Sequence, residues 1–365
     1  MTGTASLVNS AAASAPVNSG AGPLNLADVE RLAREALDGA TWDYFAGGSG
    51  DEVTLRANRE AFKRIRLRPR ILAESEPASI ATTALGTEIA LPVMVAPTAY
   101  HGLVHPDAEC ATARGAGAAG TIMVVSVNSN RTLEEIAETA SGTLWLQLYL
   151  TGDNGADAEM ISRAESSGYS ALVLTVDRPV YGAREHDRRN GFRLPDHLRA
   201  ANFGTTRDLR ARSWTTWSAV EWLLGRTRLP VVLKGVLAGA DARIAIDSGV
   251  AAVIVSNHGG RQLDGALAGI EALPEVVEAI AGRCEVYCDG GIRRGGDVIK
   301  ALALGARAVL IGRPSIWGLA IGGPAGVTEV LRMLATEIER DMTLCGACRV
   351  GDLDRSLVAP VPDLL

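Results

Sequence analysis

Histidine, aspartate and arginine side chains follow short apolar runs of the chain, and together these residue types can bind an anion and move a proton. In the run Ser256-Asn-His-Gly-Gly-Arg261, His258 lies beside two glycines and three residues before Arg261. Asp177 follows another apolar run, from which its carboxylate could orient the imidazole of His258. A histidine held by a carboxylate beside an anion-binding arginine suits general base catalysis, and the alternative is a purely structural histidine.

Two glycine-rich turns, each containing an arginine, come late in the chain. They are Asp289-Gly-Gly-Ile-Arg293 and Gly312-Arg-Pro314. Glycines let backbone N–H groups approach a phosphate closely, and arginine pairs with the anion. The pattern therefore predicts a phosphate site at these two turns. The alternative is that the glycines only make tight turns.

Lys234 also follows an apolar run, and the cysteines show no metal pattern. From its position alone, Lys234 could be a Schiff-base nucleophile or a cation that faces a cofactor. The chain has five cysteines, of which Cys345 and Cys348 have CxxC spacing without a second CxxC or a histidine pair. We predict reduced thiols there in preference to a zinc or redox site, and no metal site elsewhere.

The elements that must position these residues repeat one pattern, an apolar run followed by a helical stretch. Continuous apolar runs that alternate with helices are typical of buried parallel strands. Eight such units in series predict a (β/α)8 TIM barrel, whose catalytic groups lie at the C-terminal ends of the strands. The predicted strands are residues 93–96, 122–125, 144–150, 172–176, 231–233, 253–255, 286–288 and 309–311.

The segments that flank the strands complete the predicted organisation. Apolar residues at helical spacing predict an N-terminal helical cap over 24–72, with helices at 26–37 and 52–64, and a long final helix at 324–348. One domain then spans 24–350, with the barrel and final helix over 73–350. Residues 1–23 are predicted to be a flexible tail, and 351–365 a C-terminal tail.

The fourth connection of the predicted barrel, residues 184–234, is unusually long. It shows no clear helix before a stretch at 214–224, and it is rich in arginine, asparagine and glycine. A long loop over the C-terminal face of a barrel usually covers the active site, so we expect a lid here.

The composition excludes several classes of protein. The 365 residues are 47% hydrophobic and 21% charged, with a formal net charge of −6. This mild acidic excess argues against a nucleic-acid partner or a membrane surface. The apolar runs are far shorter than the ~20 residues that span a bilayer. Because no basic stretch followed by an apolar one opens the sequence, we predict a cytoplasmic protein.

Six motifs in order resemble the FMN-dependent α-hydroxy-acid oxidase and dehydrogenase family, which includes glycolate, lactate and mandelate enzymes. The resemblance covers about residues 25–350 and implies a TIM barrel, an FMN cofactor and a homotetramer. The motifs are Gln147-Leu-Tyr149, Thr175-Val-Asp177, Leu233-Lys-Gly235, Ser256-Asn-His-Gly-Gly-Arg-Gln-Leu-Asp264, Asp289-Gly-Gly-Ile-Arg293 and Ile311-Gly-Arg-Pro314.

The resemblance implies roles for the cofactor-binding residues. Arg293, Gly312 and Arg313 would hold the FMN phosphate, and Lys234 would face the N1/C2 edge of the flavin, where negative charge accumulates on reduction. That role is favoured over a Schiff base. The full set implied for FMN is Ala96, Pro97, Thr98, Ser126, Gln147, Thr175, Lys234, Ser256, Asp289, Gly290, Gly291, Arg293, Gly312 and Arg313.

The resemblance also implies a 2-hydroxy acid as substrate. Arg184 and Arg261 would clamp its carboxylate, Tyr44 of the lid-forming Trp42-Asp-Tyr-Phe-Ala-Gly-Gly48 segment would donate a further hydrogen bond, and Tyr149 would bond the hydroxyl. His258 would take a proton and Asp177 would stabilise the imidazolium. Whether this is the hydroxyl proton, with hydride transfer, or the α-proton, leaving a carbanion, stays open. The remaining pocket residues are expected to be Tyr100, Asn128, Tyr181 and Phe203.

Departures from the family pattern suggest a substrate. Asn128 stands where glycolate-oxidising relatives often have a bulky aromatic residue, and residues 96–106 look like hydroxymandelate-oxidising members. We therefore expect an aryl (S)-2-hydroxy acid, with lactate, glycolate or another aliphatic acid as the alternative. Ala99 stands where the family's oxidases tend to have alanine, so we expect O2 to reoxidise the flavin and give H2O2. A dehydrogenase with another electron acceptor is the alternative.

Three rival functions remain open from the sequence. An FMN barrel that isomerises or reduces another substrate would not need the paired arginines. An aldolase that uses Lys234 would bind no flavin. A flavoprotein without catalysis is disfavoured by the intact set of polar residues. The lid between Arg184 and Trp214 also looks shorter than is usual in the family.

Overall fold

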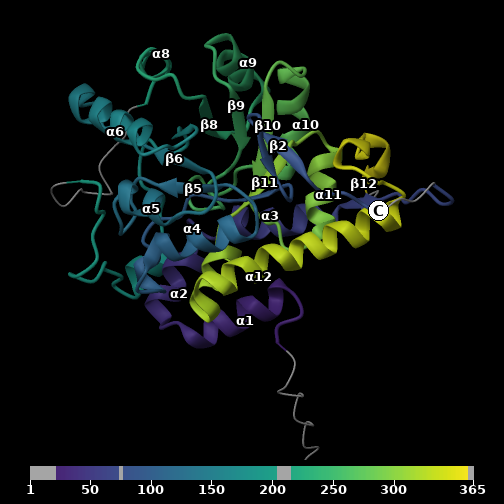
Figure 1. Ribbon diagram of the computed structural model, residues 1–365, viewed down its shortest axis with the longest axis horizontal. Coiled ribbons are helices and arrows are strands. Elements are labelled where there is room, and N and C mark those ends of the chain that lie inside the picture. The colour runs from purple at the N-terminus through teal and green to yellow at the C-terminus, as the bar shows by residue number, and fades with distance from the viewer. Residues whose placement is uncertain (1–21, 74–76, 204–214, 361–365) are drawn as a thin grey trace, which may run out of the picture.

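A closed barrel of parallel strands forms the centre of the computed structural model, which describes residues 22–73, 77–203 and 215–360 (Figure 1). The strands follow one another around the barrel in chain order, and β11 closes it by pairing with β4. The predicted TIM barrel is confirmed. Its strands are β4 (Val93–Val95), β5 (Met123–Ser126), β6 (Leu144–Leu148), β7 (Leu172–Thr175), β8 (Val231–Val236), β9 (Ala252–Val255), β10 (Glu285–Asp289) and β11 (Ala308–Ile311).

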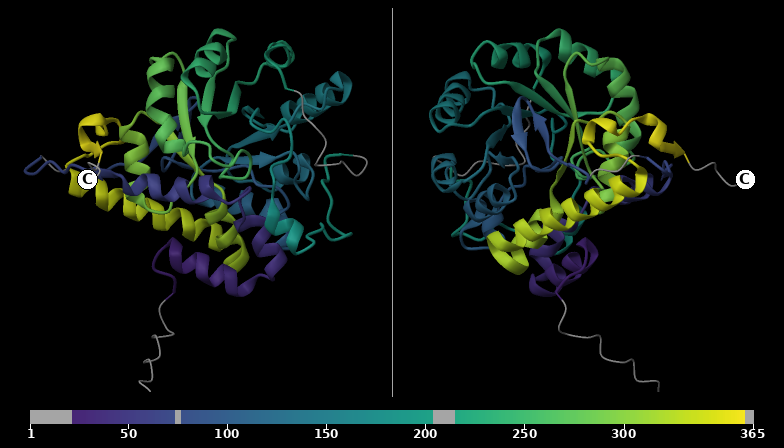
Figure 2. Two further views of the ribbon diagram at one scale, coloured as in Figure 1. Left: turned by 180° about the vertical axis from the view of Figure 1, so that it is seen from behind. Right: turned by 45° about the vertical axis from the view of Figure 1, so that its right-hand side comes forward.

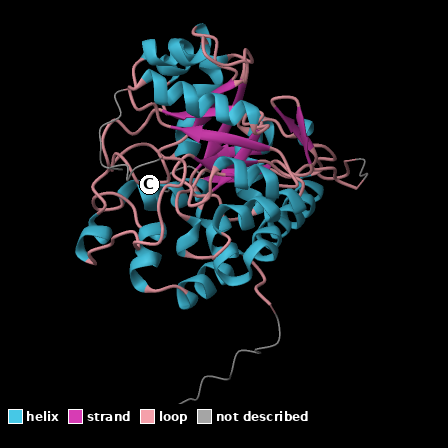
Figure 3. Ribbon diagram, turned by 60° about the vertical axis from the view of Figure 1, so that its left-hand side comes forward, coloured by secondary structure: helices cyan, strands magenta, loops and turns pink. Residues whose placement is uncertain are grey.

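The apolar strands are buried on both faces, which explains why their sequences do not alternate with polar residues. One set of side chains, including Met94, Trp145 and Tyr287, fills the barrel interior. The alternate set, including Val93 and Val95, packs outward against the helices. Figure 3 shows the strands enclosed by the helical layer. Because all strands are parallel, their C-terminal ends meet at one face of the barrel.

The outer helices follow the strands as predicted. Thr132 caps α5 with a capping box to Glu135, as its sequence suggested. The long α12 is broken at Gly323, where φ is 57° and ψ is −141°, so its last part begins near the predicted start at 324. The helices are α4 (Ala108–Ala118), α5 (Leu133–Thr139), α6 (Asn154–Ser166), α8 (Trp217–Leu224), α9 (Gly239–Asp247), α10 (Gly269–Ile280), α11 (Gly295–Ala303) and α12 (Arg313–Cys345).

Three helices precede the barrel, one more than the sequence predicted. The predicted helices are α1 (Leu26–Ala36), which packs along α12, and α3 (Val53–Lys63). Between them lies α2 (Gly39–Ala46), which begins at the capping side chain of Asp38. It is only 8 residues long and lacks an apolar stripe, so the periodicity that revealed its neighbours was absent. This helix carries Tyr44 into the site.

Two small sheets lie outside the barrel. The hairpin of β2 (Thr82–Ala84) and β3 (Thr87–Ile89) packs its apolar residues on the barrel interior, and the right-hand view of Figure 2 shows it within the ring of helices. Strand β12 (Val358–Pro360) pairs with β1 (Ile65–Leu67). The predicted C-terminal tail is therefore wrong for residues 351–360, which also contain the buried Leu353 and Leu357. The rest of both predicted tails lies mostly outside the described residues.

The lid connection contains more structure than the sequence indicated. The short helix α7 (Glu185–Arg189) lies there and corrects the prediction of no helix in the first part of the lid. Other short helices lie outside the lid, namely η1 (His101–Leu103), η2 (Val350–Asp352) and η3 (Arg355–Leu357). Residues 204–214, which include Trp214 and most of the middle of the lid, lie outside the described residues. Among the described helices, none is both long enough and apolar enough to cross a membrane.

Candidate active site

A pocket at the C-terminal end of the barrel brings most of the predicted site residues together, although they come from every barrel strand and from α2. Asp177 and Ser256 are not in its lining but support residues that are. The predicted residues that line it are Tyr44, Ala96, Pro97, Thr98, Ser126, Asn128, Gln147, Tyr149, Thr175, Tyr181, Arg184, Lys234, His258, Arg261, Asp289, Gly290, Gly291, Arg293, Gly312 and Arg313.

The imidazole of His258 is fixed by a carboxylate and by an unusual backbone. Its Nδ1 lies 2.8 Å from Oδ1 of Asp177, and its backbone N–H donates to Ser256 Oγ at 3.0 Å. His258 has φ 61°, and Gly259 and Gly260 follow at 65° and 74°, so three successive residues are left-handed. Only glycine adopts this region without strain, which accounts for the two glycines after the histidine. Because Nδ1 faces Asp177 and His258 lines the pocket, Nε2 is the ring nitrogen available to a ligand.

Opposing effects set the protonation of this pair. Burial lowers the pKa of His258, and the charge of Lys234 lowers it further. Asp177 acts to raise it, but the pKa of His258 still lies below its ordinary value. Burial alone would raise the pKa of Asp177, but His258 and Lys234 hold it below its ordinary value. At neutral pH the pair is therefore a neutral imidazole, protonated on Nδ1, beside a carboxylate, and Nε2 can accept a proton.

Lys234 is a paired cation. Its Nζ lies 2.9 Å from Ser256 Oγ and 3.2 Å from Asp289 Oδ2, with the ammonium buried. Burial acts to lower the pKa of Lys234, but Asp289 and Asp177 outweigh it and raise the pKa above its ordinary value. A Schiff-base nucleophile needs a neutral amine, so the geometry favours a fixed positive charge.

Two arginines, the buried Arg184 and the half-buried Arg261, line the same pocket. Arg184 donates from Nη1 to Tyr181 Oη at 2.6 Å, while its buried Nε has no partner among the described residues. Arg261 donates from Nη1 to the carbonyls of Tyr44 at 2.7 Å and Gly47 at 3.0 Å. Burial, and then the charge of Arg184, lower the pKa of Arg261 to about 10. Two like charges that line one pocket form a site that an anion would stabilise.

Tyr44 lies against this arginine pair and retains its proton. The guanidinium carbon of Arg261 lies 5.3 Å from the centre of the Tyr44 ring, and the ring of Phe192 stacks on it at 4.6 Å. Burial raises the pKa of Tyr44 to about 12. Its hydroxyl therefore remains a hydrogen-bond donor at neutral pH.

The turns after β10 and β11 form the predicted anion site. At Gly291, φ is 83° and an added Cβ would stand 1.9 Å from the carbonyl oxygen of Asn58, so only glycine fits. The Arg293 guanidinium lies 4.7 Å from the Trp317 ring, and its buried Nε has no partner in the described part of the chain. Arg313 donates from Nη2 to Gly47 at 2.9 Å and from Nη1 to the Gly259 carbonyl at 3.0 Å. The side chain of Arg313 thus connects the turn after β11 to the loops that contain Gly47 and Gly259.

Unsatisfied polar atoms in the pocket match the groups that FMN offers. Within the described residues, the buried atoms Gln147 Nε2, Asp289 Oδ1 and Arg293 Nε lack hydrogen-bond partners. They are donors and an acceptor from three strand ends that line one pocket. Buried polar atoms are normally satisfied, so this set indicates a polar ligand with a phosphate and further hydrogen-bonding groups. The residues present fit FMN.

Two predicted pocket residues lie elsewhere. Tyr100 is buried behind Tyr44, with 6.3 Å between their ring centres, and it does not line the pocket. Phe203 lines a separate cavity of about 390 Å³ together with Leu148 and Met160. Both assignments to the pocket wall are therefore wrong. Tyr149 is the residue that borders both hollows.

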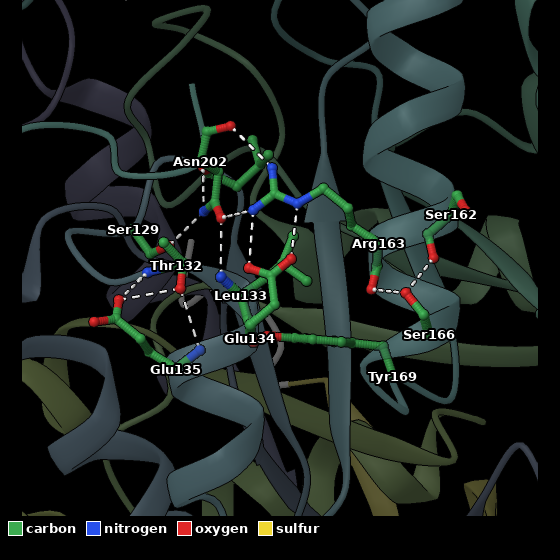
Figure 4. A network of polar contacts seen from close by, with 11 residues as sticks. Ser129, Thr132, Leu133, Glu134, Glu135, Ser162, Arg163, Ser166, Tyr169 and Asn202 are labelled. Atoms are coloured by element: carbon green, nitrogen blue, oxygen red, sulfur yellow. Dashed lines mark hydrogen bonds and ion pairs between the residues drawn. The ribbon is translucent and has the colours of Figure 1, made fainter. Parts of the chain in front are cut away.

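A polar network explains where Phe203 goes (Figure 4). Asn202 donates from Nδ2 to the Val127 carbonyl at 3.1 Å and to Ser129 Oγ at 2.8 Å, and its Oδ1 accepts from the Leu133 backbone at 2.9 Å. Arg163 of α6 donates to the Asn202 carbonyl at 3.2 Å. These bonds attach residue 202 of the lid to the β5–α5 loop, at residues on either side of Asn128. Sequence spacing gives no signal of such long-range contacts.

Sequence reasoning missed Arg178, Phe45 and Ile316 in the pocket lining. A signal existed for Arg178, because it directly follows Asp177 at the end of a predicted strand. Phe45 and Ile316 are apolar residues of the helices α2 and α12, and nothing in their local sequence separates them from ordinary core residues.

Comparisons with known proteins agree with this geometry. The profile of the family described as FMN-dependent dehydrogenase matches residues 33–360. An L-lactate oxidase of Nostoc sp. is 46% identical over 92% of this chain and 98% of its own length. A 4-hydroxymandelate oxidase of Amycolatopsis orientalis is 48% identical over 90% of this chain and 96% of its own length. A crystal structure of mandelate oxidase, 48% identical, superposes with a TM-score of 0.89 over 92% of this chain and 98% of that one. The chain belongs to the FMN-dependent α-hydroxy-acid oxidase and dehydrogenase family, and its cofactor is FMN.

Proposed function

We propose that this protein oxidises an aryl (S)-2-hydroxy acid, such as mandelate or 4-hydroxymandelate, to the 2-oxo acid. When bound, FMN supplies the two-electron acceptor, and O2 takes the electrons from it to give H2O2. The observation that carries the proposal is that the imidazole of His258, held by Asp177, and two arginines, the buried Arg184 and the half-buried Arg261, face one pocket.

The substrate is held by charge. The carboxylate pairs with Arg184 and Arg261, whose positive charges oppose each other until an anion lies between them. Tyr44 adds a neutral donor beside Arg261, and Tyr149 donates to the substrate hydroxyl. Burial raises the pKa of Tyr149 above its ordinary value, so its phenol stays protonated for this role.

The proton that the substrate loses, from its hydroxyl or from its α-carbon, passes to Nε2 of His258. Nδ1 already donates to Asp177, so the lone pair on Nε2 is the one that this pocket-lining ring can offer to the substrate. The imidazolium that results is stabilised by the buried carboxylate. Lys234 holds a positive charge at the end of β8, where it offsets negative charge on the cofactor.

The aryl preference is supported by the wall of the pocket and by the relatives. Asn128 places a small polar residue there, its Oδ1 without a partner among the described residues. A 4-hydroxymandelate oxidase and mandelate oxidase structures are among the relatives at 47–48% identity. An aliphatic acid is the second candidate, because the relative from Nostoc sp., at 46% identity, is named an L-lactate oxidase.

Anaerobic reduction of the bound FMN tests the proposal. We expect (S)-mandelate to bleach the flavin absorbance faster than (S)-lactate does, and (R)-mandelate to leave it unchanged. In air, each turnover should release one H2O2. If lactate bleaches the flavin faster, the aliphatic candidate holds, and if no 2-hydroxy acid bleaches it, the proposed function is wrong.

A variant at His258 tests its assigned role. His258→Ala should retain FMN and lose reduction by substrate by a factor of about 10²–10⁴. The exposed His197, on the lid, offers a control, and His197→Ala should react like the unaltered protein. Loss of FMN from His258→Ala would instead show that the histidine is structural.

A further inference from the structure

Arg178 is a buried cation in the active-site pocket for which neither the cofactor nor the substrate carboxylate accounts. It directly follows Asp177, lines the pocket and is only 7% exposed. Its guanidinium carbon lies 4.6 Å from the centre of the Tyr149 ring and 5.7 Å from that of Tyr181. The two rings hold the guanidinium in place by cation–π contacts, and no described residue accepts a hydrogen bond from its N–H groups, which can therefore bind a ligand.

The described residues give Arg178 no counter-ion. No carboxylate among them lies within 4.0 Å of it, and it makes no hydrogen bond with them, whereas Lys234 is paired with Asp289 at 3.2 Å. Residues 204–214 hold three arginines and one aspartate, so that stretch of sequence adds no net negative charge. An unpaired charge in a buried site costs several kcal/mol or more unless a ligand neutralises it.

FMN and the carboxylate of the proposed substrate neutralise the other arginines of the pocket. The FMN phosphate belongs at Arg293 and Arg313, and the carboxylate of the 2-hydroxy acid belongs between Arg184 and Arg261. Asp187 also faces these two substrate arginines, whose charges act to lower its pKa, although burial raises it overall. One positive charge, that of Arg178, is then left over beside the Tyr149 ring.

Resting on the proposed function, we propose that Arg178 binds a second anionic group, a carboxylate, on the side chain of the 2-hydroxy acid. The preferred substrates are then 2-hydroxy acids with one carboxylate at the reacting carbon and another at the far end. Arg178 is the residue that selects them, since no other cation of the described pocket is without an assigned partner. The proposal thus limits the preferred substrates to 2-hydroxy acids that carry a second carboxylate on the side chain.

Matched substrate pairs isolate the second anion. One aryl pair is (S)-mandelate with (S)-4-carboxymandelate, and one aliphatic pair of equal chain length is (S)-2-hydroxyvalerate with (S)-2-hydroxyglutarate. We expect the holoenzyme to favour the dianionic member of at least one pair by about 10-fold or more in kcat/KM, as a charged hydrogen bond allows. A preference for the monoanionic member in both pairs overturns the proposal.

Variants assign that preference to Arg178. Arg178→Gln should lower kcat/KM for the dianionic member about 10- to 100-fold and change kcat/KM for the monoanionic member less than about 3-fold, and Arg178→Lys should recover part of the loss. Arg226→Gln is the matched control, because Arg226 also lies over an aromatic ring, 5.5 Å from the centre of Trp222, but on the exposed surface. An equal loss on both members would show that Arg178 acts on Tyr149 and would overturn the proposal.

Binding of product-like acids keeps this test separate from that of the proposed function. Calorimetry on the oxidised holoenzyme should show 2-oxoglutarate binding at least about 10-fold more tightly than 2-oxovalerate, and Arg178→Gln should remove the difference. If no 2-hydroxy acid reduces the flavin, the proposed function fails while these affinities still decide the role of Arg178. Equal affinities of the unaltered protein for the two acids overturn it.

Discussion

Nδ1 of His258 and Oδ1 of Asp177 lie 2.8 Å apart, although 81 residues separate them in the chain. Asp177 follows β7 and His258 follows β9, with β8 between them, and that strand contributes the close approach. At Gly235 on β8, an added Cβ would stand 2.6 Å from the Asp177 Cβ. The pair therefore depends on a glycine in the intervening strand, which lets the carboxylate lie across it.

The pH profile of kcat/KM should report this pair. Because His258 must be neutral to accept a proton and its pKa lies below 6.5, activity on (S)-mandelate should be level near neutral pH and fall as the pH drops below that value. In Asp177→Asn the group that raises the pKa of His258 is lost, so the acid limb should move to lower pH. Turnover should fall about 10²–10⁴-fold at every pH. An acid limb that moves to higher pH in this variant contradicts the assignment.

The affinity for FMN should depend on Arg293 but not on its neighbour. Burial lowers the pKa of Arg293 to about 10, and a bound phosphate would compensate the buried charge. Arg293→Gln should weaken FMN binding about 10- to 100-fold, measured by quenching of FMN fluorescence on titration with apoprotein. Arg294→Gln is the control, since Arg294 points away to an ion pair with Glu337 at 2.5 Å. Equal affinities in the two variants would place the phosphate elsewhere.

The anchor at Asn202 should affect substrate binding through the loop that carries Asn128. Asn202→Ala removes bonds to Val127, Ser129 and Leu133, which should cost about 1–3 kcal/mol of unfolding free energy and raise KM with little change in FMN content. Asn202→Asp keeps the acceptor toward Leu133 and should give a smaller effect. Asn190→Ala, which removes an exposed bond to Asp43, serves as the control for the lid. Unchanged KM in Asn202→Ala would show that the anchor is only structural.

The sequence predicted the strand ends well because a barrel gathers them at one face whatever the connections do. His258, Asp177 and Lys234 were therefore placed correctly from order alone. Tyr100 and Phe203 were not, because their positions depend on contacts between loops, such as those of Asn202. No local pattern encodes such contacts.

Outside the barrel too, elements with a local sequence pattern were predicted and elements without one were missed. Helix α1 has an apolar stripe and was predicted, while α2 has none and was missed. The β2–β3 hairpin and β12 consist of only three residues per strand, too few for an alternating pattern to stand out. Their stability comes from pairing and burial that only the folded chain provides.

A buried carboxylate away from the reacting groups should make stability depend on pH. Glu109 on α4 accepts from the backbone N–H of His101 at 3.0 Å and of Asn130 at 2.9 Å, and so joins the loops after β4 and β5. Burial raises its pKa from 4.5 to about 7, although these hydrogen bonds oppose the shift. The folded protein thus binds this proton more tightly than the unfolded chain does.

The sign of the effect follows from that difference. The contribution of Glu109 to unfolding free energy is complete below about pH 4.5 and is lost as the pH rises through about 7, by at most about 3 kcal/mol for this shift. Chemical denaturation between pH 5 and 8 should therefore show the unaltered protein losing stability relative to Glu109→Gln, which cannot ionise. Glu159→Gln, at an exposed carboxylate of α6, should follow the unaltered protein throughout. Parallel stability curves for Glu109→Gln and the unaltered protein would mean that Glu109 keeps one charge state across this range, because its two backbone donors then outweigh its burial.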